Sequence, residues 1–448
     1  MSNLFSIADA LCAPDPSPLP LRQLWMDRCI ASISSLSHAL HVAALRADPI
    51  TSPIISDLRA RLLRLPSRSV GLACSSPVAM RALGAISQIN SDISSADLGP
   101  NCGANAFDQT VFQTLVNEFM LITIDAELHA NIRPLNLLAP SSMARLLCAS
   151  GNWFQNGQVF PVEKSETVLH GTSTVFVSSK DSVLGGDAID RYPKLPEGAQ
   201  SADFACSFQA ALHLLSEFSP GFHRSCEGLL RVAVPMQIPK VGVPSASLNE
   251  LPGAFCLTAV KDHNLLTEQI VHECSHAFLF LLQELDPLLD ISVHGDGWGE
   301  PLEYSPWRDD LRPLNGLLHG LVVFTRVAWF HARARTAANP HNESMSLRRL
   351  AALLPQLEVG LSILGAKASF TSTGARLFRG LKESIALLRR TIDSAAQQTE
   401  PFYMECSSIQ QDSFCATERQ RAHLLRSTIS DHGDFIHALG ASPIQVRA

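Results

Sequence analysis

The first 150 residues carry apolar side chains three and four positions apart, which is the spacing of amphipathic helices. Residues 18–47 show the pattern best, because one helix face there would collect Leu21, Leu24, Trp25, Cys29, Ile30, Ile33, Leu36, Leu40 and Ala44. The predicted helices cover residues 18–47, 52–65, 77–89 and 107–131. A stretch rich in Ser, Asp, Gly and Asn at residues 90–105 predicts a loop or an internal boundary. Residues 1–150 are therefore expected to form a helical region.

The pattern changes after residue 150, where runs rich in Val, Thr and Phe predict strands. These runs cover residues 158–162, 167–177, 229–238 and 254–260, with a helix predicted at residues 202–218. Pro161 limits the first run to an edge strand, since proline has no N–H to donate to a neighbour. Residues 151–228 form a mixed strand and helix region and a candidate peptide-binding surface. From residue 265 the pattern is mostly helical, interrupted at residues 294–313.

Composition excludes several classes of protein. Hydrophobic residues make up 46% of the 448-residue chain and charged residues 17%, below the usual share of about 25%, so the chain is not intrinsically disordered. The formal net charge of −7, with no run of Lys or Arg, argues against nucleic-acid binding. Fully apolar runs fall short of a membrane span, and Asp9 and Asp15 do not suit a signal peptide. We expect a cytoplasmic protein.

The eleven cysteines are an odd number, lie far apart and form no CxxC pair. Neither a zinc ribbon nor a thioredoxin-like redox site is therefore indicated. We expect most of these cysteines to be reduced and to pack as small apolar residues.

The strongest chemical signal is the HExxH motif, His272-Glu273-Cys274-Ser275-His276, inside a helical pattern at residues 265–285. Residues four apart lie on the same face of a helix, so both imidazoles can reach one metal ion. Glu273 is one position away and stays near the metal, which makes it the candidate catalytic residue. The motif predicts a metal-binding core at residues 229–340, preceded by residues 1–228 and followed by a helical region at residues 341–448.

The third metal ligand decides the class of site. Leu279 and Leu282 stand where the metzincin extension needs Gly and His, so that class is excluded. A gluzincin would take a later glutamate, but none of the candidates lies in a convincing helical setting: Glu284, Glu300 and Glu303. His319 is the favoured ligand, because it begins a long apolar helix close to a loop with two arginines. His294 and His331 are weaker candidates.

The loop before that helix, residues 304–314, contains Trp307, Arg308 and Arg312. It could simply be a polar loop that caps the next helix, with Pro313 at the first turn. A tryptophan and two arginines beside a metal site are also what a carboxylate pocket needs, because a guanidinium group binds a carboxylate through two parallel hydrogen bonds. A hydrolytic zinc peptidase has less need of two such arginines.

Four motifs between residues 241 and 329 together resemble the HExxH motif-containing peptide modification family of ribosomal peptide natural-product pathways. The motifs are Ser245-Ala246-Ser247 with Leu251-Pro252-Gly253-Ala254; Val271-His272-Glu273 through His276; Ser305-Pro306-Trp307-Arg308-Asp309-Asp310 with Arg312-Pro313-Leu314; and Gly316-Leu317-Leu318-His319-Gly320. Leu311 replaces the proline that is usual before the last arginine. The resemblance implies non-haem iron and 2-oxoglutarate-dependent β-hydroxylation of a side chain in a precursor peptide.

Non-haem iron oxygenases need three protein ligands on one side of the metal, most often two histidines and a carboxylate. Here the expected set is His272, His276 and His319, which leaves Glu273 to orient a ligand or a water. Arg308 or Arg312 would bind the far carboxylate of 2-oxoglutarate. Arg308 is favoured because Trp307 beside it could wall the pocket.

We therefore predict an α+β, mostly helical protein with a zincin-like HExxH core, a few strands and helical terminal regions. Two other functions stay open. In a zinc metallopeptidase, Glu273 would act as the base for a zinc-bound water. A non-catalytic scaffold would keep a structural metal and bind a peptide with its strands.

Overall fold

A computed structural model describes much of the chain from residue 2 to residue 396. The described parts are residues 2–28, 30–31, 34, 51–66, 70, 73–74, 120–127, 130, the strands between 145 and 177, and 199–396 without 239–242, 248, 250–251, 291–301, 309–310 and 336–339. These residues are mostly helical with a few strands, which confirms the α+β prediction. The chain divides into two compact units: residues 1–10 with 15–285, and residues 11–14 with 286–448.

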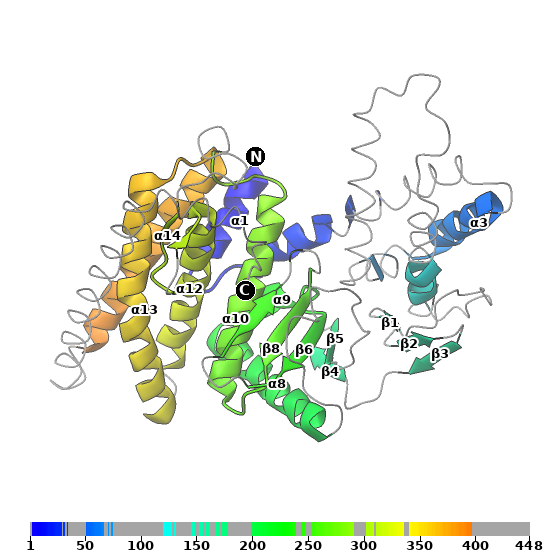
Figure 1. Ribbon diagram of the computed structural model, residues 1–448, viewed down its shortest axis with the longest axis horizontal. Helices are drawn as coiled ribbons and strands as arrows, with labels where there is room; N and C mark the ends of the chain where they lie inside the picture. Colours follow the sequence, from blue (N-terminus) through cyan, green and yellow to red (C-terminus); the bar gives the residue numbers. More distant parts are fainter. Residues whose placement is uncertain are drawn as a thin grey trace, which may run out of the picture. The chain divides into compact units, whose positions relative to one another are not determined.

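The first unit contains a five-stranded sheet with the order β4-β5-β6-β8-β7 (Figure 1). The strands are β4 (Thr167–His170), β5 (Ser173–Val177), β6 (Val232–Met236), β7 (Ser245–Ser247) and β8 (Ala254–Thr258). Strands β5, β6 and β8 run parallel, and β4 and β7 are antiparallel edge strands. Every residue of β6 and β8 is buried, as expected for central parallel strands covered on both faces.

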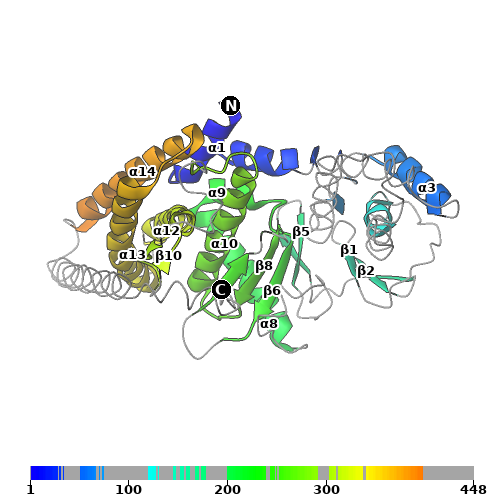
Figure 2. The same ribbon diagram turned by 45° about the horizontal axis from the view of Figure 1, so that its top comes forward.

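Three helices of this unit lie near the sheet: α8 (Ala199–Phe218), α9 (Pro220–Cys226) and α10 (His263–Gln283). Helix α10 packs against α8, β7 and β8, and Figure 2 shows it beside β8. The prediction at residues 202–218 is thus confirmed, with the helix beginning three residues earlier. The carboxylate of Asp15 accepts hydrogen bonds from the backbone N–H groups of Gly221 and Phe222, which fixes the first turn of α9.

The N-terminal part of the first unit contains α1 (Ser2–Cys12), whose last two residues belong to the second unit, and α3 (Thr51–Arg64). A smaller antiparallel sheet consists of β1 (Arg145–Leu147), β2 (Asn152–Gln155) and β3 (Gln158–Pro161). Pro161 ends β3, which lies at the edge of this sheet as predicted. The helices predicted at residues 77–89 and for most of 107–131 lie outside the described residues.

The described part of the second unit contains three long helices, α12 (Leu314–Ala334), α13 (Pro340–Lys367) and α14 (Ser372–Ala396). They lie side by side in both views (Figures 1 and 2), with α12 packed against the other two. A short ribbon of β9 (Glu303–Tyr304) and β10 (Leu311–Arg312) precedes α12. Residues 11–14 also belong here: the buried guanidinium of Arg326 on α12 donates hydrogen bonds to the carbonyl oxygens of Leu11 and Ala13.

Among the described residues, one segment of α13, Met345–Lys367, is long and apolar enough to cross a membrane by length and composition. Core helices commonly pass the same test. The segment packs along α12, and five of its leucines are buried: Leu350, Leu353, Leu354, Leu357 and Leu364.

Candidate metal centre

Helix α10 carries the HExxH motif and begins directly after β8. Asp262 is its N-cap, and the carboxylate accepts hydrogen bonds from the N–H groups of Asn264 and Leu265 at 2.9 and 3.1 Å. Such a cap satisfies backbone donors that have no partner within the helix. The start of the helix, and with it the position of the motif three turns later, is therefore set by local sequence.

The two motif histidines lie on the least buried stripe of this part of α10, which is formed by His272, His276 and Phe280. The imidazole centroids of His272 and His276 are 4.9 Å apart with an angle of 66° between the rings. His276 also stacks on Phe280, with ring centroids 6.0 Å apart. The His272 side chain is 22% exposed. The structure thus brings together two imidazoles that face the same way, as the spacing predicted.

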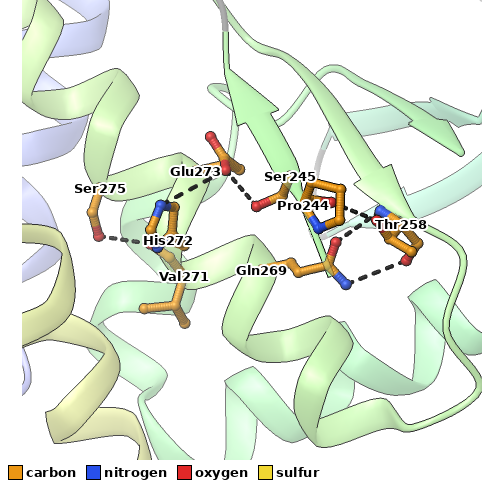
Figure 3. A network of polar contacts seen from close by, with 8 residues as sticks. All are labelled: Pro244, Ser245, Thr258, Gln269, Val271, His272, Glu273 and Ser275. Carbon is orange, nitrogen blue, oxygen red and sulfur yellow. Dashed lines mark hydrogen bonds and ion pairs between the residues drawn. The ribbon is translucent and has the colours of Figure 1, made fainter. Parts of the chain in front are cut away.

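Glu273 does not share this exposure, because only 1% of the residue is accessible to solvent. Its Oε1 atom accepts a hydrogen bond of 2.5 Å from the hydroxyl of Ser245, which lies on the edge strand β7 (Figure 3). The same oxygen lies 4.0 Å from Nε2 of His272. The motif carboxylate is therefore held between the edge strand and the first imidazole.

A second set of hydrogen bonds ties β7 and β8 to α10 (Figure 3). The side-chain amide of Gln269 pairs with the backbone of Thr258, accepting from its N–H at 2.8 Å and donating to its carbonyl at 3.2 Å. The Thr258 hydroxyl in turn donates to the carbonyl oxygen of Pro244, the residue before β7. Polar contacts that are buried or partly buried thus join β7, β8 and α10 around Glu273.

Cys274 and Ser275, between the motif histidines, are core residues. Burial raises the pKa of the Cys274 thiol well above its usual value, and a hydrogen bond with Cys226 raises it further. A protonated, buried thiol is a poor nucleophile and a poor metal ligand. The Ser275 hydroxyl donates to the carbonyl of Val271, one turn earlier. Neither side chain takes part in the candidate site.

His319 lies on α12 in the second unit and is 7% exposed. Burial lowers the pKa of its imidazole to about 4, so the ring is neutral at pH 7. A histidine must be neutral to bind a metal ion. No group of three His, Cys, Asp or Glu side chains that could hold a metal ion is found among the residues that the structure describes. The ligand set His272, His276 and His319 therefore stays a prediction.

The other ligand candidates are engaged elsewhere or lie outside the described residues. Glu284 pairs with Arg28 at 2.6 Å, and the nearly buried Glu303 lies 3.6 Å from Nζ of Lys367. His331 is buried, with Nδ1 3.4 Å from the hydroxyl of Ser346. His294 and Glu300 are among the residues that are not described.

The candidate co-substrate residues belong to the second unit. The Trp307 ring stacks on Phe324 of α12, with centroids 5.4 Å apart and an angle of 12° between the planes. It also fits against two glycines, Gly320 of α12 and Gly360 of α13. Packing therefore accounts for Trp307, which anchors the loop before α12. Arg308 beside it is exposed, and Arg312 on β10 is half-buried. Pro313 is the N-cap of α12, next to the predicted first-turn position.

Substitution of Gly320 should show how tightly the Trp307 ring is held. A Cβ atom at Gly320 would lie 2.6 Å from Cε3 of Trp307, so Gly320→Ala must displace the indole. We expect a loss of about 1–2 kcal/mol in the free energy of unfolding, because overpacking outweighs the better helix propensity of alanine. Gly316→Ala on the same helix is the control, since its Cβ would meet nothing closer than 3.6 Å. Urea unfolding of both variants measures the difference, and equal stabilities would contradict this packing.

The pKa of His319 predicts a pH dependence of stability in the metal-free protein. Below pH 6.5 the unfolded chain takes up a proton at this residue, whereas the folded chain does so only near pH 4. The free energy of unfolding should therefore fall as the pH drops from 6.5 to 4, by about 3 kcal/mol from this residue. His319→Gln should lack that part of the slope. Urea titrations of both proteins at several pH values measure it, and parallel slopes would show that folding does not lower the pKa of His319.

The chain matches no known family profile, and comparison with curated proteins finds no significant relative. Sequence reasoning identified the motif helix but gave no role to Ser245, Thr258 or Gln269. Gln269 had no distinguishing signal, since it follows two other polar residues, Thr267 and Glu268. Ser245 belongs to the Ser245-Ala246-Ser247 motif that carries the resemblance, but the motif gave it no role, because that role depends on a partner 28 residues away.

Proposed function

We propose that the protein is a non-haem iron and 2-oxoglutarate-dependent oxygenase. It hydroxylates the β-carbon of a side chain in a ribosomally synthesised precursor peptide, in the cytoplasm. The observation that carries the proposal is the placement of Glu273, which is buried and accepts a hydrogen bond from Ser245. A hydrolytic base must reach a metal-bound water. A carboxylate held by a neighbouring strand better suits a residue that orients a ligand.

The proposed site assigns a task to each residue in a zincin-like core. His272, His276 and His319 would hold the iron through neutral imidazoles, as the paired rings of α10 and the lowered pKa of His319 support. Arg308, or else Arg312, would bind the far carboxylate of 2-oxoglutarate by a charge-assisted pair. The bound iron, with 2-oxoglutarate and O₂, supplies the oxidant for a C–H bond. The anchored Trp307 would fix the position of Arg308, the next residue in the chain.

A zinc metallopeptidase is the second candidate function. It is favoured by the 4.0 Å separation of Glu273 Oε1 and His272 Nε2, which keeps the carboxylate next to the first imidazole. In that enzyme Glu273 would take a proton from the water that attacks the peptide. The oxygenase and the peptidase would use the same histidines as metal ligands. They differ in the role of Glu273, which orients a ligand in the first and acts as a base in the second.

Native metal analysis combined with a turnover assay tests the proposal. The full chain is purified without added metal, its metal content is measured, and it is incubated with 2-oxoglutarate and a candidate precursor peptide. Iron with succinate release and a peptide heavier by one oxygen atom is the expected result. Zinc with a cleaved peptide would replace the proposal by the peptidase. Bound metal with neither reaction would favour a scaffold that keeps a structural metal.

A further inference from the structure

We infer that Ser245 is a positioning residue for the proposed metal centre: its hydroxyl holds the Glu273 carboxylate away from Nε2 of His272, the imidazole nitrogen nearest to that carboxylate oxygen. The inference rests on the proposed metal site and concerns how the chain prepares it. Two groups converge on one oxygen atom, Glu273 Oε1. The Ser245 hydroxyl donates to it at 2.5 Å, whereas Nε2 of His272 lies 4.0 Å away, beyond hydrogen-bonding distance.

The Ser245 hydroxyl is the one hydrogen-bond donor to this carboxylate within the part of the chain that the structure describes. A buried carboxylate without a donor is costly. Without the serine hydroxyl, Oε1 is free to move toward Nε2 of His272, now 4.0 Å away, and to accept a hydrogen bond from Nε2–H. That contact would fix the proton on Nε2, because the partner of one ring nitrogen decides which nitrogen carries the proton. A protonated Nε2 offers no lone pair to a metal.

The strand that carries Ser245 is itself fixed to the motif helix. Gln269 binds both backbone groups of Thr258, and Thr258 binds the carbonyl of Pro244, directly before Ser245. Gln269 and Glu273 are four residues apart and therefore lie on the same side of α10. Gln269 binds the last residue of β8 and Glu273 binds the first residue of β7. The serine hydroxyl is thereby presented at a set position rather than by a free loop.

Ser247 is a matched control on the same strand. Ser245 and Ser247 are two residues apart and so face the same side of β7, and both are half-buried. No contact between Ser247 and Glu273 is found in the described structure. Ser245→Ala and Ser247→Ala therefore remove the same atom from the same strand, and only the first removes the contact with the carboxylate.

The test measures binding of Co(II), as a probe for a divalent ion, to the metal-free full chain by titration calorimetry and by the visible spectrum of the bound ion. We expect Ser245→Ala to weaken binding about tenfold, the lower end of the effect of residues that orient metal ligands. Ser245→Thr keeps a hydroxyl and should bind as wild type does, as should Ser247→Ala. In a Glu273→Ala background, Ser245→Ala should have no further effect, because the carboxylate it controls is gone.

Each outcome decides a separate question. Wild-type affinity in Ser245→Ala would overturn the positioning role and leave the metal site standing. Equal weakening by Ser245→Ala with and without Glu273 would show that the serine acts on the strand and not through the carboxylate, which also overturns the inference. If the wild-type chain binds no Co(II), the proposed metal site fails first. Thermal unfolding of each variant without metal confirms that it is folded.

Discussion

His272→Ala and His276→Ala should each abolish metal retention in the purified protein. The two imidazoles are proposed metal ligands, and the structure places their ring centroids 4.9 Å apart on one stripe of α10. Structural zinc sites gain about 10–16 kcal/mol from four ligands, so one ligand is worth roughly 3 kcal/mol, or about a hundredfold in affinity. With an affinity about a hundredfold lower, the variant should lose its metal ion to a chelator during purification. Metal content after dialysis against EDTA measures it.

His213→Ala is the control for these two variants. His213 is an exposed histidine on α8 of the same unit. It is not a proposed ligand, so His213→Ala should retain metal as the wild type does. The variants at His272 and His276 should keep the unfolding temperature of the metal-free wild type, since both side chains are only partly buried. Stoichiometric metal in either variant would place the site elsewhere in the chain.

Glu273→Gln should separate oxygenase from peptidase. Glutamine keeps an oxygen that can accept the Ser245 hydrogen bond, but it cannot take up a proton. A peptidase would lose a factor of about 10² or more in rate with its base. An oxygenase uses no water nucleophile, so hydroxylation should stay within about tenfold of wild type, the lower range for a residue that orients a ligand. Mass spectrometry of the peptide distinguishes an added oxygen atom from fragments.

The comparison of Glu273→Gln with wild type needs matched metal content and a control variant. The metal content of Glu273→Gln must be matched to wild type before rates are compared, because the carboxylate lies 4.0 Å from His272 Nε2. Ser247→Ala serves again as the neighbour that should change neither reaction. Peptide fragments produced by the wild type and absent with Glu273→Gln would refute the oxygenase proposal.

The sequence predicted the elements whose periodicity repeats over many residues. The motif helix was expected at residues 265–285 and runs from His263 to Gln283, because an Asp cap and a long apolar face both act locally. Strands β6 and β8 also follow from local sequence, because the buried strands of a parallel sheet are continuous apolar runs. The mutual orientation of His272 and His276 followed directly from helix geometry.

The short strands could not be predicted in this way. β7 has three residues, Ser-Ala-Ser, and forms only because its backbone pairs with β8. Residues 304–314 were expected to be a loop, yet β10 lies there and pairs with β9, two residues on each side. Such strands depend on partners rather than on their own side chains. The boundary at residue 285 likewise falls inside the predicted core region 229–340, where the composition gives no sign of it.

Residues 11–14 can reach their folded positions only after the ribosome has synthesised helices α12 and α14, because they bind to these helices. The Cys12 thiol donates to the carbonyl of Leu377 on α14, and Arg326 holds the carbonyls of Leu11 and Ala13. These contacts join residues more than 300 positions apart in the chain. A nascent chain emerges from the ribosome at about 5–20 residues per second. Synthesis of the more than 300 residues between them takes roughly 15 to 75 s at this rate. Residues 11–14 therefore wait that long for the helices that bind them, and during this time their apolar side chains are accessible to chaperones.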